Sequence, residues 1–344
     1  MFDVNAHIHT PYSFSAFESV EEALEHAAKE GVKVVGINDF YSTDGYAAWK
    51  EGCAKRGLYP LYGIEFISLN AEDQAAGLRV NDPNNPGRTY ISGKGLAYPV
   101  ILKGEPLRQL EAVKAESNAQ VEKMCGKLNE WLKAEGKSIQ LDFNEIREKL
   151  TKGSIRERHL AKALRMALYP DEENPAKLEN ELRSKLLKAG GAAFVPESPE
   201  AFLPMKTVQE IIEAAGGIPT YPFLADDAKG SFTDFEGDLM KAADTLKKRG
   251  FRSVEFITTR NTTAVLEQYS GYLEDEGFIV SFGSEHNTPA MKPVKLHTRD
   301  AAELSDKLKT INWRGACAIA AHQAGLDSVA AGEDLIMQTV WRHS

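Results

Sequence analysis

Two histidines one residue apart lie near the start of the chain, His7 and His9. In an extended strand alternate side chains project from the same face, so both imidazoles point one way while Ala6 and Ile8 point the other way. Histidine is the commonest metal ligand in proteins. The pair therefore favours a metal site, although two histidines at the end of a short strand can also simply lie in solvent.

Two acidic residues follow the next two predicted strands. The apolar run 32–37 is typical of a strand buried on both faces, and Asp39 comes just after it. A third strand is predicted over 58–69 and contains Glu65, whose unpaired charge would be costly there unless it binds something. Helical patterns separate the strands, which indicates a parallel sheet. Ligands bind beyond the carboxyl ends of such strands, so we expect both carboxylates near the histidine pair.

The period of the apolar residues changes in the middle of the chain. Turn-forming residues dominate 71–99, apart from a short predicted strand over 88–92. From about 105 to 135 the apolar residues recur at helical spacing. Further helices are predicted over 143–151, 154–168 and 175–188. This middle segment is predicted to be an all-helical insertion.

Alternation of strands and helices then resumes. Strands are predicted over 218–223, 252–257 and 278–282. Together with the first three they make at least six parallel strands, enough for a closed or nearly closed barrel. We expect an α/β fold with four parts: a first part of the barrel (1–99), a helical insertion that forms a lid (100–199), a second part of the barrel (200–296) and C-terminal helices packed on the barrel (297–344).

Composition and charge narrow the possible functions. The formal net charge of −9 argues against a surface that binds nucleic acid. Three widely spaced cysteines without a C-x-x-C motif are typical of reduced thiols in a cytosolic protein. The sequence has neither a basic and apolar leader nor eighteen consecutive apolar residues. We therefore expect a cytoplasmic protein that is neither exported nor inserted into a membrane.

Several motifs, taken in order, resemble one known family. The chain carries His7-x-His9, Asp39, Gly63-Ile64-Glu65, Arg156-x-Arg158-His159 and Gly283-Ser284-Glu285-His286. Over about residues 2–290 this succession resembles the PHP (polymerase and histidinol phosphatase) family. The resemblance implies a distorted (β/α)7 TIM-like barrel with an all-helical insertion. It also implies up to three divalent metals at the strand ends and, usually, hydrolysis of phosphoesters.

The sequence departs from the family pattern at four positions that usually bind metal. Phe14 and Phe40 occupy positions of one site, and Tyr90 and Tyr221 replace the two histidines of another. Phe cannot bind a metal, and a neutral Tyr is a poor substitute for imidazole. The resemblance therefore implies one well-formed site for Zn, Mn or Fe and a second site without its histidines. The ligands of the well-formed site would be His7, His9, Glu65 and Glu285.

Two residues are candidates for catalysis beside this metal. Asp39 or His286 could orient or deprotonate a water molecule, although Asp39 could instead be a strand-end carboxylate that caps a loop. Glu285 and His286 are adjacent, so only one can point inward from a strand, whereas both could do so from a loop. The four expected ligands would form a closed structural site unless Glu285 leaves room for water.

Candidate substrate-binding residues lie in the insertion and on one strand-end loop. Arg156 and Arg158 suit a phosphate group, although they could also be solvated charges. His159 lies on an apolar helix face, where a core histidine is the ordinary alternative to a lid residue that reaches the substrate. Arg260 and Asn261 follow the strand over 252–257, and an ordinary helix-start loop is the alternative there.

The function expected from these features is metal-dependent hydrolysis of a small phosphate ester, by a phosphomonoesterase or phosphodiesterase of the EC 3.1 type that uses metal-activated water. The expected partner is a small phosphorylated molecule rather than nucleic acid or membrane. A catalytically impaired PHP-like protein that binds a metabolite or phosphorylated ligand is one alternative, and a single-metal hydrolase of a non-phosphate substrate is another. Substrate identity and oligomeric state stay open.

Overall fold

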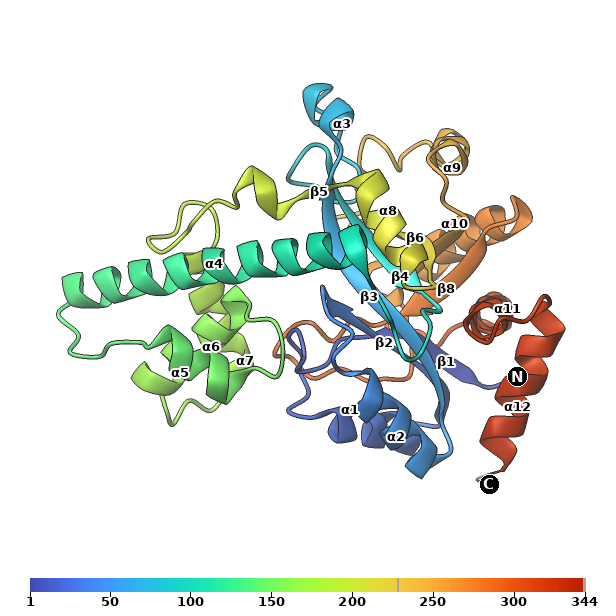
Figure 1. Cartoon of the computed structure of the whole chain (residues 1–344), viewed down its shortest axis with the longest axis horizontal. Coiled ribbons are helices and arrows are strands. Elements are labelled where there is room, and N and C mark those ends of the chain that lie inside the picture. The colour runs from blue at the N-terminus through green and yellow to red at the C-terminus, as the bar shows by residue number, and fades with distance from the viewer. Residues whose placement is uncertain (228, 343–344) are drawn as a thin grey trace.

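The computed structural model of the chain describes residues 1–227 and 229–342, and its central feature is a barrel-shaped sheet (Figure 1). The sheet order is β1-β2-β3-β4-β6-β7-β8, with the short β5 added to β3. Its strands are β1 (Asp3–Ile8), β2 (Val32–Phe40), β3 (Tyr59–Leu69), β4 (Arg88–Lys94), β5 (Leu203–Pro204), β6 (Ile218–Phe223), β7 (Ser253–Ile257) and β8 (Ile279–Gly283). A bridge between Ile8 and Glu285 links the two outer strands, so the barrel is nearly closed.

The strand directions agree with the parallel arrangement expected from the sequence, with one exception. Parallel pairing joins β1 to β2, β2 to β3, β6 to β7 and β7 to β8. The exception is β4, which is antiparallel to both β3 and β6. The ends of β1, β2 and β3 thus lie at one rim of the barrel, and this rim carries the side chains of the site.

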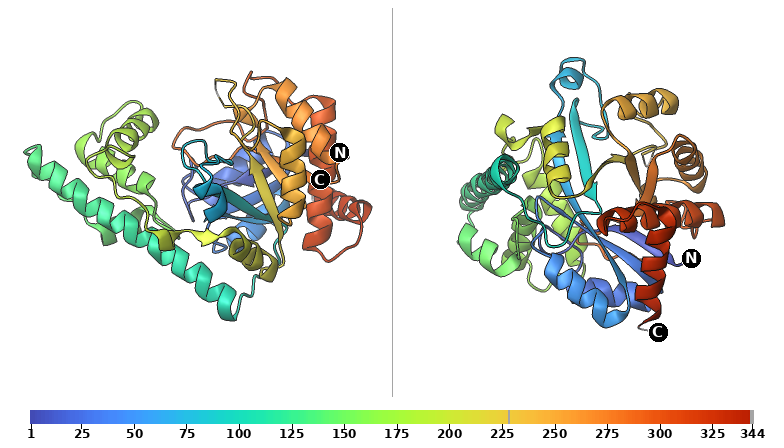
Figure 2. Two further views of the ribbon diagram at one scale, coloured as in Figure 1. Left: turned by 90° about the horizontal axis from the view of Figure 1, so that it is seen from above. Right: turned by 45° about the vertical axis from the view of Figure 1, so that its right-hand side comes forward.

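Helices cover the outside of the barrel (Figures 1 and 2). Ser19 caps the first of them by accepting a hydrogen bond from the backbone N–H of Glu22. The helices outside the insertion are α1 (Val20–Lys29), α2 (Tyr46–Arg56), α3 (Ala71–Ala75), α8 (Met205–Ala214), α9 (Leu239–Lys248), α10 (Thr263–Asp275), α11 (Asp306–Gln323) and α12 (Val329–Trp341). No helix in 1–227 or 229–342 is long and apolar enough to cross a membrane.

The segment between β4 and β5 is helical and has an apolar cluster of its own. It comprises α4 (Gly104–Ala134), α5 (Phe143–Leu150), α6 (Glu157–Leu168), α7 (Pro175–Leu182) and the π-helical turn η1 (Arg183–Leu187). Leu128, Leu132, Leu160 and Leu164 pack together in this cluster, apart from the barrel core. Figure 1 shows α4 extending away from the barrel with α5 to α7 along its outer half. We call residues 104–187 the insertion.

Two glycines allow the close backbone approaches that the barrel interior requires. A Cβ at Gly283 would lie 2.2 Å from the Cβ of His7, so β8 can pack beside β1 only without a side chain there. A Cβ at Gly63 would lie 2.3 Å from Asn38 Oδ1. The space left by these glycines is filled by buried polar side chains of the neighbouring strands, which meet inside the barrel.

Candidate metal centre and substrate cavity

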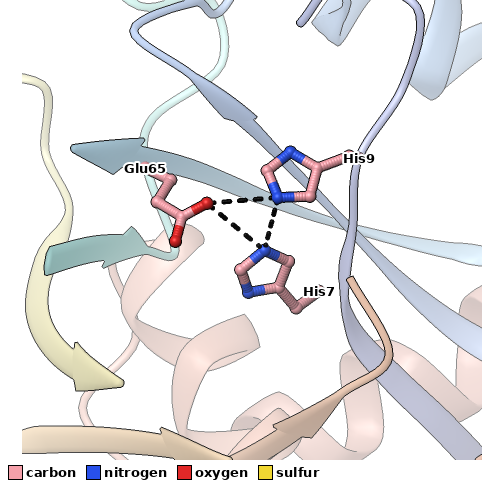
Figure 3. Close-up of side chains that lie close together, drawn as sticks. All are labelled: His7, His9 and Glu65. Atoms are coloured by element: carbon pink, nitrogen blue, oxygen red, sulfur yellow. Dashed lines mark hydrogen bonds and ion pairs between the residues drawn. The ribbon is translucent and has the colours of Figure 1, made fainter. Parts of the chain in front are cut away.

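Three buried side chains from β1, the loop after it and β3 converge inside the barrel rim (Figure 3). Nε2 of His7 lies 3.2 Å from Nε2 of His9. Oε2 of Glu65 lies 3.1 Å from the His9 nitrogen and 3.8 Å from the His7 nitrogen. All three side chains are nearly inaccessible to solvent. The sequence-based expectation that His7, His9 and Glu65 lie together is met in the structure.

The chemistry of these three atoms fits a metal ion. Oε2 of Glu65 is buried and makes no hydrogen bond. Ligand atoms about 2.0–2.1 Å from a tetrahedral Zn²⁺ are roughly 3.3 Å apart, which is close to the separations of 3.1 and 3.2 Å and shorter than the third, 3.8 Å. Two imidazoles and one carboxylate form the ligand set of several catalytic zinc sites, where a fourth position stays open. The cluster can therefore hold one divalent cation with room for a further ligand.

His7 is oriented by a buried carboxylate that sequence reasoning missed. Oε2 of Glu255, on β7, lies 3.0 Å from Nδ1 of His7. A carboxylate only accepts hydrogen bonds, so Nδ1 carries the proton and the lone pair is on Nε2, which also lies 3.2 Å from the amide nitrogen of Asn38. Lys94 donates to the same Oε2 at 2.7 Å and to Asn38 Oδ1 at 3.1 Å. Burial alone would raise the pKa of Glu255, but Lys94 and His7 hold it well below its usual range.

His9 is oriented in the same sense through a hydroxyl group. Its Nδ1 lies 3.2 Å from Oγ of Ser13, and that hydroxyl donates to Asp39 Oδ1 at 2.6 Å. The hydroxyl therefore accepts from Nδ1, which leaves the lone pair of Nε2 facing Glu65. Burial lowers the pKa of His9, but the nearby Glu65 and Asp39 outweigh it and raise the pKa. The electrostatic potential at the cluster is therefore strongly negative.

Asp39 lies behind His9 rather than in the cavity. Its carboxylate accepts from the backbone N–H of Thr10 at 2.8 Å, from Thr10 Oγ1 at 2.5 Å and from Ser13. Burial raises the pKa of Asp39 despite these donors. These contacts match the loop-capping alternative for Asp39, which is not among the residues that line the cavity.

Glu285 faces the cavity but is held by an arginine. Both of its carboxylate oxygens lie 2.8 Å from Nη2 of Arg260, and its backbone carbonyl accepts from the His9 N–H at 2.7 Å. Burial would raise the pKa of Glu285, whereas the Arg260 guanidinium lowers it below its ordinary value. The described structure therefore brings three of the four expected ligands together, and the fourth forms an ion pair instead.

His286 points away from the cavity. Its Nδ1 lies 2.7 Å from Oγ of Ser284, its Nε2 lies 2.9 Å from the carbonyl oxygen of Lys292, and its ring stacks on Phe17. Burial lowers the pKa of the ring. Both nitrogens are engaged, so in this position the ring has none left for proton transfer. Of the two adjacent candidates, Glu285 is the one that faces the site.

A cavity of about 890 Å³ lies between the barrel rim and the insertion. Glu65, Glu285 and Arg260 line it on the barrel side, and Arg156 and Arg158 line it on the insertion side. Such a volume is typical of a site for a small organic molecule. The cavity thus joins the candidate metal cluster to charged side chains of the insertion.

The two insertion arginines rest on aromatic rings of the barrel. The guanidinium carbon of Arg156 lies 4.7 Å from the centre of the Phe40 ring, which itself stacks on His9 at 5.2 Å. The guanidinium carbon of Arg158 lies 5.6 Å from the centre of the Phe14 ring. Burial, with the like charge of Arg183, lowers the pKa of Arg158 to about 10. Both arginines are therefore held at the cavity rather than solvated freely.

His159 and Asn261, two other expected substrate-binding residues, have structural contacts instead. Nδ1 of His159 accepts from the backbone N–H of Arg156 at 2.9 Å and closes the first turn of α6. Asn261 donates to the carbonyl oxygens of Leu224 and Asp226. Neither side chain is among the residues that line the cavity. His159 is therefore a structural histidine, which was the alternative to a substrate-binding role. Asn261 links two barrel loops next to Arg260.

Three of the four aromatic replacements line the cavity, namely Phe14, Phe40 and Tyr90. The fourth, Tyr221, does not line the cavity, because its buried hydroxyl donates to Glu236 at 2.6 Å on the other face of the sheet. The register explains this orientation: Thr220 pairs with Ser92 and Pro222 pairs with Glu255, whose side chains point inward. Side chains alternate along a strand, so Tyr221 between them points outward.

Two important residues went unnoticed in the sequence, Glu255 and Lys94. Glu255 lies within the predicted apolar strand 252–257, and an acidic residue there was a usable signal because an unpaired buried charge is costly. Lys94 lies beyond the end of the predicted strand 88–92. The sequence did not indicate that the two charges lie side by side in the barrel.

Comparison with known proteins supports the fold. A proposed metal-dependent phosphoesterase from Bifidobacterium adolescentis superposes with a TM-score of 0.63 at 16% identity, covering 90% of this chain and 94% of that one. An amidohydrolase from Chromobacterium violaceum, solved with bound sulfate and no metal, gives a TM-score of 0.61 at 16% identity, covering 88% and 94%. No curated protein matches the chain.

The sequence itself matches a family model over part of its length. Residues 5–156 match the model of the PHP domain, a stretch that contains the histidine pair, Asp39 and Glu65. The predicted α/β barrel is confirmed by the nearly closed sheet and by its structural neighbours. The resemblance seen in the sequence motifs is therefore confirmed over residues 5–156, which are similar to the PHP domain.

Proposed function

We propose that this protein is a metal-dependent hydrolase of a phosphate ester, with His7, His9 and Glu65 as ligands of one divalent metal. The observation that carries the proposal is the Glu65 carboxylate oxygen, buried without a hydrogen bond and facing two imidazole nitrogens at the spacing of metal ligands. The names of the two structural neighbours, a proposed phosphoesterase and an amidohydrolase, support a metal-dependent hydrolase.

The charged side chains of the cavity support an anionic substrate. Arg260 lies on the barrel side next to Glu285, and Arg156 and Arg158 reach the cavity from the insertion. A guanidinium matches the geometry of a phosphate oxygen pair and stays charged at all relevant pH values. In the proposed complex Arg260 exchanges part of its contact with Glu285 for the phosphate group.

The proposed chemistry divides between the metal and the chain. A divalent cation at the cluster would polarise a phosphoryl oxygen and acidify a water molecule. Glu285 faces the same cavity and lies close enough for its charge to act on His9, so we assign it the role of proton acceptor. Glu255 and Asp39 position His7 and His9 from behind. Arg260 orients the phosphate.

The test combines metal content with turnover. Untagged protein is analysed for bound metal and assayed on 4-nitrophenyl phosphate, bis(4-nitrophenyl) phosphate and matched carboxylic esters and amides. Wild type is compared with Glu65→Gln and with a control, Glu51→Gln, which alters an exposed carboxylate on α2 paired with Lys55. We expect phosphoester turnover that needs metal and is lost in Glu65→Gln only. Turnover that survives Glu65→Gln and chelation would overturn the proposal.

The ligand geometry also favours a second candidate, a single-metal hydrolase of a non-phosphate substrate. Two histidines and a glutamate with one open position are the ligands of metal enzymes that cleave amides. The aromatic rings of Phe14, Phe40 and Tyr90 occupy the cavity wall where further ligands would be needed for a site with several metals. Turnover of the carboxylic esters or amides, and not of the phosphoesters, would establish this second function.

A further inference from the structure

We propose that the ligand of this cavity carries a second anionic group, a phosphate or carboxylate, which the cations of the insertion bind while its phosphate ester lies at the barrel side. The inference rests on the proposed function, since it takes the phosphate ester to lie next to His7, His9 and Glu65. It narrows the substrate class from small phosphate esters to organic molecules with two anionic ends.

The charges that line the cavity are divided unequally between its two sides. The insertion side has four cations, namely Arg156, Arg158, Arg183 and Lys188, the last of which follows η1 directly. They surround a single carboxylate, Glu157. The other side is acidic, and its charged residues are Glu65, Asp82, Glu197 and Glu285 with Arg88 and Arg260. A divalent metal would neutralise the acidic side. The insertion side would keep its positive charge.

The single carboxylate of the insertion side is already occupied. Oε1 of Glu157 accepts from Arg183 at 2.8 and 3.0 Å and from Lys188 at 3.1 Å. Its other oxygen lies 4.0 Å from Nε of Arg156, too far for a hydrogen bond. The carboxylate therefore satisfies Arg183 and Lys188 and leaves the two guanidiniums at the cavity without a close anion.

Arg158 and Arg156 make few polar contacts for groups with five donors each. Nη1 of Arg158 donates to Asn180 Oδ1 at 3.2 Å, and this amide, not a carboxylate, is its polar partner within 1–227 and 229–342. Nη1 of Arg156 donates to Ser117 Oγ at 3.3 Å, although four fifths of its side chain is buried (19% exposed). Withdrawing a cation from water without a partner is unfavourable. An anionic ligand group would supply the missing partner.

The cavity is larger than one phosphate group needs. Its volume of about 890 Å³ extends past the arginines to apolar side chains of the insertion, Val121, Met124 and Leu187. These apolar residues suit the carbon skeleton of an organic ligand. The cations belong to the insertion and the residue that follows it, whereas the metal ligands His7, His9 and Glu65 lie inside the barrel rim (Figure 3). One molecule that is anionic at both ends would satisfy both sides.

The test measures binding of probes that cannot be hydrolysed, by calorimetry on the full chain loaded with Zn²⁺. Phosphonoacetate, 3-phosphonopropionate and 4-phosphonobutyrate are compared with ethyl-, propyl- and butylphosphonate, which have the same chain lengths without the carboxylate. We expect at least one carboxylated probe to bind tenfold or more tightly than its alkylphosphonate counterpart. We also expect 3-aminopropylphosphonate to bind more weakly than propylphosphonate, because its ammonium group would face the cations.

Variants assign the effect to the insertion. In Arg158→Met the affinity ratio of each carboxylated probe to its alkyl counterpart should fall towards one. The control Arg165→Met removes an arginine of the same helix that pairs with Glu179 and does not line the cavity, so it should keep the wild-type ratio. Circular dichroism of both variants verifies that the insertion remains helical.

The outcomes of the two proposals are separable. A ratio near one for all three chain lengths in wild type would overturn the second anionic group, even if phosphoesters are hydrolysed. An equal loss of affinity for every probe in Arg158→Met would overturn it as well, because the arginine would then bind the phosphonate itself. A large ratio without turnover of any ester would support the second group and reject the hydrolase.

Discussion

Nδ1 of His7 lies 3.0 Å from the Glu255 carboxylate, and the two residues are 248 positions apart in the chain. Because the carboxylate can only accept, this contact fixes the proton on Nδ1 and turns the lone pair of Nε2 towards His9 and Glu65. Nζ of Lys94 lies 2.7 Å from the same carboxylate oxygen, Oε2 of Glu255. The metal cluster is thus pre-organised by charges on β4 and β7 that do not themselves line the cavity.

Replacing this carboxylate should weaken metal binding. In Glu255→Gln the amide can present its N–H₂ group to His7, which would favour the wrong tautomer, and we expect a loss of about 10–100-fold in Zn²⁺ affinity. Competition with a chromophoric chelator measures it. The conservative variant Glu255→Asp keeps an acceptor and should lose less. Equal affinity of wild type and Glu255→Gln at unchanged secondary structure would contradict the assigned role.

The metal stoichiometry should be close to one ion per chain. Phe14, Phe40 and Tyr90 line the cavity and offer no imidazole or carboxylate for a further ion. Elemental analysis after dialysis against Zn²⁺ and then against metal-free buffer gives the number. His9→Ala should reduce it to nearly zero. A value of two or three in wild type would mean that residues outside the described cluster bind metal.

Replacing Arg260 should weaken substrate binding more than it changes the stability of the fold. Its guanidinium forms the ion pair with Glu285 and faces the cavity, so Arg260→Met should raise the KM for a phosphoester at least tenfold, which corresponds to about 1.4 kcal/mol. Steady-state kinetics measures the change. Arg79→Met, which breaks an exposed pair with Asp234, serves as the control and should leave KM unaltered. An unchanged KM in Arg260→Met would exclude the phosphate contact.

Acid should destabilise the insertion through His159. Burial lowers the pKa of His159 to about 3, because its Nδ1 must stay unprotonated to accept from the Arg156 N–H. Between pH 6.5 and about 3 the unfolded chain therefore binds a proton that the folded chain does not, so the free energy of unfolding falls as the pH falls. The expected slope from this group is up to about 1.4 kcal/mol per pH unit.

The matched variant for this prediction is His159→Gln, which keeps an acceptor at the third residue of α6 but cannot be protonated. Urea unfolding at pH 7, 6, 5 and 4 compares the two proteins. The stability of wild type should fall more steeply towards acid than that of the variant. If the free energy of unfolding depends on pH in the same way in both proteins, the lowered pKa of His159 is contradicted.

Local patterns in the sequence predicted the elements and the first part of the site. Alternation along β1 was enough to place His7 and His9 on one face, and the rule that ligands lie beyond strand carboxyl ends brought in Glu65. The helical period of the insertion was likewise a local signal. Each of these rests on residues a few positions apart, where spacing alone fixes geometry.

The charged groups that meet in the site come from segments far apart in the chain. Glu255 contacts both His7 and Lys94 inside the barrel. Glu285 forms an ion pair with Arg260. Asp39 lies behind His9, which it contacts through Ser13. The outward direction of Tyr221 followed from the register of β6 against its neighbours. Such partners are set by packing between segments far apart in the chain, and a single sequence contains no local pattern that specifies them.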